Sequence, residues 1–121
     1  MIIADTGFWV ALLNQRDDFH AVAKASAARI NERLVTTWPV VTEVCHLLQT
    51  RVGQHRSVQF LQAHEDKLFQ LFPLQDAELL RMAKLMERYA NLPMDFADAS
   101  LVVLAEQIGH GRILSTDIEE M

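Results

Sequence analysis

Four short apolar runs recur along the chain and predict the strands of a sheet. The first, residues 1–4, is rich in β-branched side chains and has no polar alternation, which is typical of a parallel strand covered on both faces. Similar runs lie at residues 34–37, 67–74 and 112–116, and Pro73 closes the third. The long separations between the runs leave room for helical connections.

The segments between the runs have the composition and apolar spacing that favour helices. Pro39 stands at a first helical position, where proline is favourable, and Asp76 is of a residue type that caps helices. Gly53 and Gly109 are placed as stop signals. The pattern predicts helices over residues 8–14, 19–33, 39–51, 57–65, 76–90 and 95–107. Strands that alternate with helices predict β-α-β units, and therefore an α/β fold with a parallel sheet covered by helices.

No linker, repeat or low-complexity tract divides the 121 residues, so we expect a single domain over residues 1–121. The longest apolar run, residues 8–13, is far too short to span a membrane, and the N-terminus lacks the basic region of a signal peptide. Cys45 is the only cysteine, which excludes an intrachain disulfide and a cysteine-based zinc site. These features favour a cytoplasmic protein.

Acidic residues follow the first and the last predicted strands directly. Asp5 comes after the first strand and Asp117 after the last. Because the carboxyl ends of parallel strands share one edge of the sheet, where open α/β sheets bind ligands, these two side chains can meet there.

Further acids interrupt the apolar stripes of two predicted helices. Glu43 lies between Val40 and Leu47, and Asp98 precedes Leu101 by three residues, so we expect both on inner helix faces. Asp95 lies one turn before Asp98. Carboxylates in such positions are costly unless they are paired or bind a cation, and no basic residue lies near them in sequence. Several acids at one edge favour Mg²⁺ or Mn²⁺, and such a site favours hydrolysis of phosphodiesters by metal-activated water.

Each of these acids also has a simpler interpretation. An aspartate after a strand is often only a turn residue or a helix cap, Asp95 follows Pro93 where a cap is expected, and Glu43 is a solvated acid if its helix face is assigned wrongly. The Glu43-x-x-His46 pair occurs once, whereas di-iron bundles need it twice, so His46 is interpreted as a surface residue. Cys45 is interpreted as a buried, inert thiol.

The formal net charge is −5, from 11 Lys and Arg against 16 Asp and Glu. This charge argues against a protein that holds nucleic acid by bulk positive charge, but not against one that acts on it through metal ions. The five candidate acids account for the whole excess of acidic over basic residues. Six arginines are candidates for contacts with RNA phosphates or with a partner protein, and the sequence does not choose among them: Arg16, Arg51, Arg56, Arg81, Arg88 and Arg112.

Four segments, in order along the chain, resemble the motifs of PIN-domain proteins, and among these the VapC-like toxins of bacterial toxin–antitoxin pairs. They read IIADTG at residues 2–7, VTEV at 41–44, MDFADASL at 94–101 and ILSTD at 113–117. The resemblance implies a three-layer α/β/α sandwich and a Mg²⁺- or Mn²⁺-dependent endoribonuclease. It also implies an RNA substrate, a homodimer and silencing by a small antitoxin.

The resemblance assigns roles to the candidate acids. It implies Asp5, Glu43, Asp98 and Asp117 as catalytic metal ligands or water-positioning groups, with Asp95 as an auxiliary ligand. Thr6 matches a hydroxyl position that supports the site.

The chain departs from the family pattern after Asp117, where relatives continue with an acid, a phenylalanine and a further strand. Glu120 stands near the position of that acid. We therefore expect a sheet of about four strands with the last family strand missing. Two alternatives stay open: a catalytically inactive PIN-like module that binds a protein or RNA, and a small metal phosphatase, which the lack of a phosphate-binding loop disfavours.

Overall fold

The computed structural model describes residues 1–116, and at its centre lies a parallel sheet. Its strands are β1 (Ile2–Ala4), β2 (Leu34–Thr36), β3 (Phe69–Leu71) and β4 (Ile113–Leu114). They lie in the order β3-β2-β1-β4, so that β1 is paired on both sides. Ile3 is in register with Val35 of β2 and with Ile113 of β4. The carboxyl end of β1 is therefore central in the sheet, and Asp5 follows it directly.

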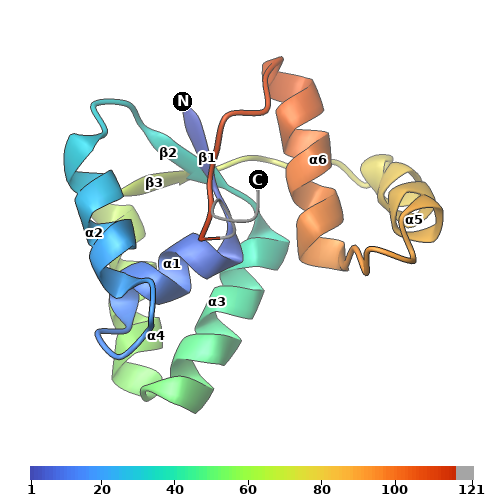
Figure 1. The fold of residues 1–121 in the computed structure, drawn as a ribbon. Helices are drawn as coiled ribbons and strands as arrows, with labels where there is room; N and C mark the ends of the chain where they lie inside the picture. The colour runs from blue at the N-terminus through green and yellow to red at the C-terminus, as the bar shows by residue number, and fades with distance from the viewer. Residues whose placement is uncertain (117–121) are drawn as a thin grey trace.

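Helices connect the strands and cover the sheet. They are α1 (Thr6–Leu13), α2 (His20–Arg29), α3 (Trp38–Arg51), α4 (Gln54–Glu65), α5 (Glu78–Arg88) and α6 (Phe96–Ile108). In Figure 1, α5 and α6 lie to one side of β1, and α1, α2 and α4 to the other. Within residues 1–116, no helix combines the length and the apolar character needed to cross a membrane.

The main core is built from the apolar residues of the strands and of the helices that follow them. Trp9 of α1, Phe60 of α4 and Phe69 of β3 meet there, with ring centroids 5.0–5.4 Å apart. All three side chains are almost fully buried. A second cluster joins α5 to α6 through Met82 and Val103, among others. Helix α5 is thereby fixed on the outer side of α6.

The α/β class, the parallel sheet and the four strands predicted from the sequence are confirmed, and Gly109 ends α6 in the left-handed conformation, with φ 83°. Two details of the prediction were wrong. Helix α2 ends at Arg29 rather than residue 33, because the chain becomes extended at Ile30 to reach β2. Asp76 does not cap α5, whose N-cap is Ala77 without a side-chain hydrogen bond.

Candidate active site

Asp5 links the end of β1 to the start of α1. Its Oδ1 accepts a hydrogen bond from the backbone N–H of Phe8 at 2.9 Å, so that Asp5 is the N-cap of α1. The side chain is half-buried at the edge of the sheet. Asp5 is therefore the cap of α1, as one interpretation of the sequence predicted, and this role places its carboxylate at the switch from strand to helix without deciding whether it also binds a cation.

Glu43 reaches the same edge from α3. Its side chain is half-buried, and the hydroxyl of Thr6 lies close enough to influence its titration. Burial raises the pKa of Glu43, the Thr6 hydroxyl lowers it, and the negative charges of Asp95 and Asp5 raise it further, with a net rise. Thr6, the first residue of α1, and Asp5, its N-cap, therefore both act on the Glu43 carboxylate of α3.

Asp95 and Asp98 form a capping box at the start of α6. Asp95 Oδ1 accepts from the backbone N–H of Asp98 at 2.8 Å, and Asp98 Oδ2 accepts from the backbone N–H of Asp95 at 3.2 Å. Partial withdrawal from water raises the pKa of Asp98 to about 6, and the nearby charges of Asp95 and Glu43 add to this rise. Asp98 is more exposed than the sequence predicted: it stands at the rim of α6 instead of on a core-facing stripe.

Four of the five predicted acids therefore lie within electrostatic reach of one another: Asp5, Glu43, Asp95 and Asp98. They come from the carboxyl end of β1, from α3 and from the start of α6. Among residues 1–116, the ion pairs join Met1 and Arg112 to Glu32, and Arg81 to Glu106, so that none of them involves Glu43, Asp95 or Asp98. We call these four residues the acidic cluster.

The donor set of the acidic cluster fits a hard divalent cation. Carboxylate oxygens are the ligands that Mg²⁺ and Mn²⁺ prefer, and a cation would offset the repulsion that raises two of the pKa values. The side chains of residues 1–116 do not bring three acidic, histidine or cysteine ligands around one point. Mg²⁺ does not require three, because it usually binds through one or two carboxylates, with waters and substrate phosphate completing its shell.

The described chain ends beside the acidic cluster. A Cβ built on Gly7 would lie 2.8 Å from Thr116 Oγ1 and 3.7 Å from Asp5 Oδ1, so that glycine is what allows the loop after β4 to approach α1 this closely. Asp117, the fourth predicted site acid, and Glu120 lie outside the described residues.

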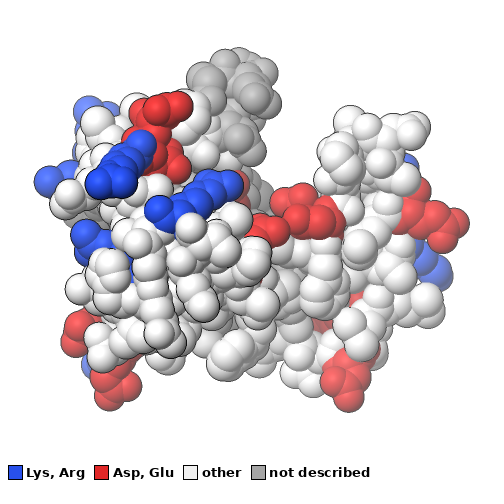
Figure 2. Space-filling model, turned by 90° about the horizontal axis from the view of Figure 1, so that it is seen from below, with Lys and Arg blue, Asp and Glu red and all other residues white. Residues whose placement is uncertain are grey.

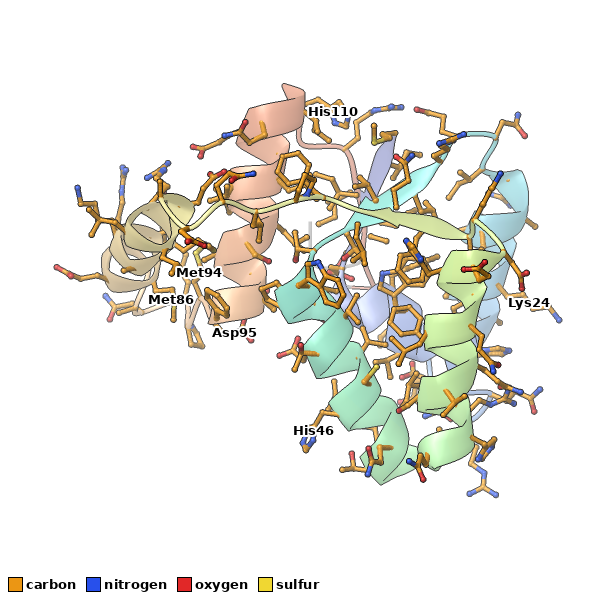
Figure 3. The ribbon with its side chains drawn as sticks, turned by 180° about the vertical axis from the view of Figure 1, so that it is seen from behind. Lys24, His46, Met86, Met94, Asp95 and His110 are labelled. Carbon is orange, nitrogen blue, oxygen red and sulfur yellow. The ribbon has the colours of Figure 1, made fainter. Side chains whose placement is uncertain are left out.

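Two grooves open from the acidic cluster. One, of about 310 Å³, is lined by Asp5 and Asp98 and by apolar side chains of α6, β1 and β4. The other, of about 450 Å³, is lined by Glu43, Asp95 and His46, among others. Figure 3 shows the His46 side chain projecting outward from α3. Acidic side chains occupy the middle of the face shown in Figure 2, with basic side chains beside them. A chain molecule on this face can contact both kinds of charge.

Three buried hydroxyls that position the site were not recognised in the sequence. Thr36 Oγ1 donates to the carbonyl of Ala4 at 3.0 Å, directly before Asp5. Thr37, at the N-cap of α3, contacts Ser100 of α6. The only signal in the sequence is that these polar residues stand within otherwise apolar segments.

The residues set aside in the sequence keep their simple interpretations. His46 is exposed. Burial raises the pKa of the half-buried Cys45 thiol, and this disfavours a reactive thiolate.

A four-stranded parallel sheet with an acidic cluster at the carboxyl end of its central strand defines a class of α/β domain with a candidate cation site. The family model of the PIN domain matches residues 2–119. The chain therefore belongs to the PIN domain family, as the motifs in its sequence indicated.

Two proteins of Mycobacterium tuberculosis are similar to this chain over nearly its whole length. Ribonuclease VapC26 is 28% identical over 116 residues, which cover 96% of this chain and 86% of VapC26. The crystal structure of VapC20, a toxin that cleaves the sarcin–ricin loop, superposes with a TM-score of 0.90. It is 22% identical, and the match covers 97% of this chain and 90% of VapC20. The structural similarity to VapC20 confirms the fold.

Proposed function

We propose that this protein is a metal-dependent endoribonuclease and the toxin of a toxin–antitoxin pair. The observation that carries the proposal is the convergence of Asp5, Glu43, Asp95 and Asp98 at the carboxyl end of β1, where their mutual repulsion calls for a cation. The name of the VapC26 ribonuclease and the RNA-cleaving activity of the VapC20 toxin support RNA as the substrate class.

Asp5, Glu43, Asp98 and Asp117 would hold Mg²⁺ or Mn²⁺, with Asp95 as an auxiliary ligand. A bound ion of this kind lowers the pKa of an attacking water and offsets charge on the phosphate.

The chain itself orients these carboxylates. The Thr6 hydroxyl favours the ionised form of Glu43, and the capping box fixes Asp98 against the backbone of Asp95. The Asp5 carboxylate is held by the N–H of Phe8 at the start of α1. Since each acid is anchored to a helix, the cluster keeps its arrangement when RNA enters, and this preorganisation favours the reaction.

The same proposal includes the partners and the compartment of a toxin. We place the protein in the cytoplasm, as a homodimer that a small cognate antitoxin silences. Exposed apolar side chains beside the site, Trp38 and Phe96 among them, provide surface for protein contacts.

The test is cleavage of RNA by the purified protein with Mg²⁺ or Mn²⁺, compared with the same reaction in chelator. We expect Asp5→Asn and Asp98→Asn each to lower the rate by at least 100-fold, on the order of what loss of a group that stabilises the transition state costs. Asp66→Asn, which changes an exposed acid after α4, is the matched control and should cleave as the parent does. Equal rates for Asp5→Asn and the parent would disprove the assignment.

A second candidate function is a PIN-like module that binds RNA or protein without catalysis. The observation in its favour is that residues 1–116 alone do not gather three ligands for one ion. Calorimetric titration with Mn²⁺ separates the two candidates. No heat and no cleavage, with partner binding intact, would support the module.

A further inference from the structure

The structure divides the six arginines that the sequence left undecided into two groups. Arg81 pairs with Glu106 at 2.6 Å, Arg112 donates to Glu32 at 2.8 Å, and the Arg88 guanidinium lies 5.4 Å from the ring centre of Tyr89. The other three line one cavity of about 200 Å³, together with Asn14, Gln15 and Val52: Arg16, Arg51 and Arg56. We call these three the arginine triad.

The arginine triad is assembled where three helices come together. Arg16 follows α1, Arg51 is the last residue of α3, and Arg56 lies in the first turn of α4. Gly53 allows the tight corner between α3 and α4 with φ 151°, a value that other residues rarely adopt. The amino end of α4 adds partial positive charge at this corner and the carboxyl ends of α1 and α3 add partial negative charge, so the positive charge at the cavity comes from the three guanidiniums themselves.

The hydrogen-bonding capacity of the triad is only partly used. Arg56 Nη1 donates to Gln59 at 2.8 Å, whereas its buried Nε has no hydrogen-bond partner among residues 1–116. None of the three guanidiniums forms an ion pair within residues 1–116. The nearby Asp17 carboxylate accepts from the N–H of Phe19 and does not line the cavity. Three unpaired guanidiniums around a concave polar surface are a site for an anion.

The triad lies at the far ends of α1, which begins directly after Asp5, and of α3, which carries Glu43. Helix α1 starts beside Asp5 and leads to Arg16, and α3 carries Glu43 eight residues before Arg51, about 12 Å at the rise of a helix. These two helices pack against each other. Figure 2 shows basic side chains on the same face as the central acidic ones. One strand of nucleic acid can therefore contact the acidic cluster and the triad together.

We propose that the arginine triad binds a backbone phosphate of the RNA strand whose scissile bond lies at the acidic cluster. This inference rests on the proposed ribonuclease function. The guanidinium fork matches phosphate oxygens, and Asn14 and Gln15 add amide donors to the same cavity. A contact of this kind fixes the register of the strand without reading its bases. The protein as a whole has a net charge of −5, so the triad would provide the local positive charge that RNA binding needs.

The test is RNA binding rather than cleavage. A short fluorescein-labelled single-stranded RNA of mixed sequence is titrated with Asp98→Asn protein at several salt concentrations, and anisotropy is measured. Adding Arg51→Gln or Arg16→Gln should weaken binding about tenfold, and should reduce the slope of log K against log salt by about 0.7 for each phosphate that the protein no longer neutralises. Arg51→Lys should retain the salt slope, because it keeps the charge.

The matched control is Arg81→Gln, which removes an arginine that Glu106 already neutralises, and it should bind RNA as the Asp98→Asn background does. Thermal unfolding verifies that each variant is folded, and the substitutions are made at Arg16 and Arg51 because these side chains are exposed, whereas Arg56 is partly buried.

One further variant combines Asp98→Asn with Arg16→Gln and Arg51→Gln. The proposal would be overturned if this variant bound RNA with the affinity and the salt slope of Asp98→Asn alone. Loss of binding to an acidic protein partner with RNA binding intact would also overturn it, and would assign the triad to that partner. If the parent protein bound RNA through the triad but cleaved none, the ribonuclease function would fail while the phosphate site remained.

Discussion

The hydroxyls of Thr37 and Ser100, 63 positions apart in the chain, lie 2.6 Å from each other in a fully buried part of the molecule. Ser100 has one hydroxyl proton, which it donates to the carbonyl of Ala97 at 2.6 Å. Thr37 is therefore the donor to Ser100 Oγ. This bond fixes the start of α3, which carries Glu43, against the first turns of α6, which carry Asp95 and Asp98.

Removing either partner of this bond should loosen the contact between α3 and α6. Thr37→Val should cost about 1 kcal/mol, since it removes one donor and leaves Ser100 bonded to Ala97. Ser100→Ala should cost more, about 1–3 kcal/mol, because it leaves the buried Thr37 hydroxyl without an acceptor. Urea unfolding measures both. The costs should not be additive in the double variant, and full additivity would show that the bond contributes nothing.

The like charges of the acidic cluster predict that Asp98→Asn changes the Tm in opposite directions without and with metal. In chelator at pH 7.5 the variant should have a higher Tm than the parent, because it removes a carboxylate whose pKa is raised to about 6 by withdrawal from water and by neighbouring charges. With Mn²⁺ the parent should gain Tm and the variant should gain little, since a ligand that binds only the folded state stabilises it.

Thermal unfolding in both buffers measures this reversal. Asp66→Asn serves as control and should keep the same Tm difference from the parent in both. A parent Tm that Mn²⁺ does not raise would contradict a metal site in the acidic cluster.

The sequence was sufficient to predict the α/β class and the convergence of the acids, because both follow from short-range patterns. An apolar run that ends in Asp5 places that residue at the edge of any parallel sheet, and the capping box of Asp95 and Asp98 is a local motif. The order of the strands could not be predicted, since β1 pairs with β2 across 32 positions (Ile2 with Leu34) and with β4 across 110 positions (Ile3 with Ile113).

The dependence on long-range contacts also explains why the position of Asp98 was predicted wrongly and why the arginine triad was not predicted. Asp98 was expected to face the core because of its spacing to Leu101, but α6 packs on α5 as well as on α3, and its first turn leaves Asp98 at the rim. The arginine triad joins residues 16, 51 and 56 only after three helices have met. No local pattern distinguishes these arginines from Arg81 and Arg112, which are paired.

The two roles of Asp95, cap and charge, can be separated by two substitutions. Asp95→Asn keeps an N-cap of similar quality and removes the negative charge near Glu43, whereas Asp95→Ala removes both. We expect the alanine variant to be about 1 kcal/mol less stable than the asparagine variant in chelator. Urea unfolding of both gives this difference. Equal stability would mean that the capping box does not stabilise α6.

At the amino ends of the strands, an ionic contact ties the residue before β4 to the residues that precede β1 and β2, and it predicts a defined pH dependence. Glu32, just before β2, accepts from Arg112 at 2.8 Å and from the N-terminal ammonium at 2.9 Å, and Arg112 also donates to the carbonyl of Met1. These bonds lower the pKa of Glu32 from 4.5 to about 2. A carboxyl whose pKa is lower in the folded protein stabilises it above the unfolded value, and loses that effect as the pH falls through the folded value.

Glu32→Gln should therefore have a slightly lower Tm than the parent at pH 7, by a few degrees at most because the pair is exposed. The difference should be constant above about pH 5.5, should shrink below pH 4.5 and should vanish near pH 2. Arg112→Gln is the matched variant, and combining the two should add little to either alone. Thermal unfolding at several pH values measures the difference, and a gap that persists at pH 2 would assign the effect of Glu32 to packing instead of charge.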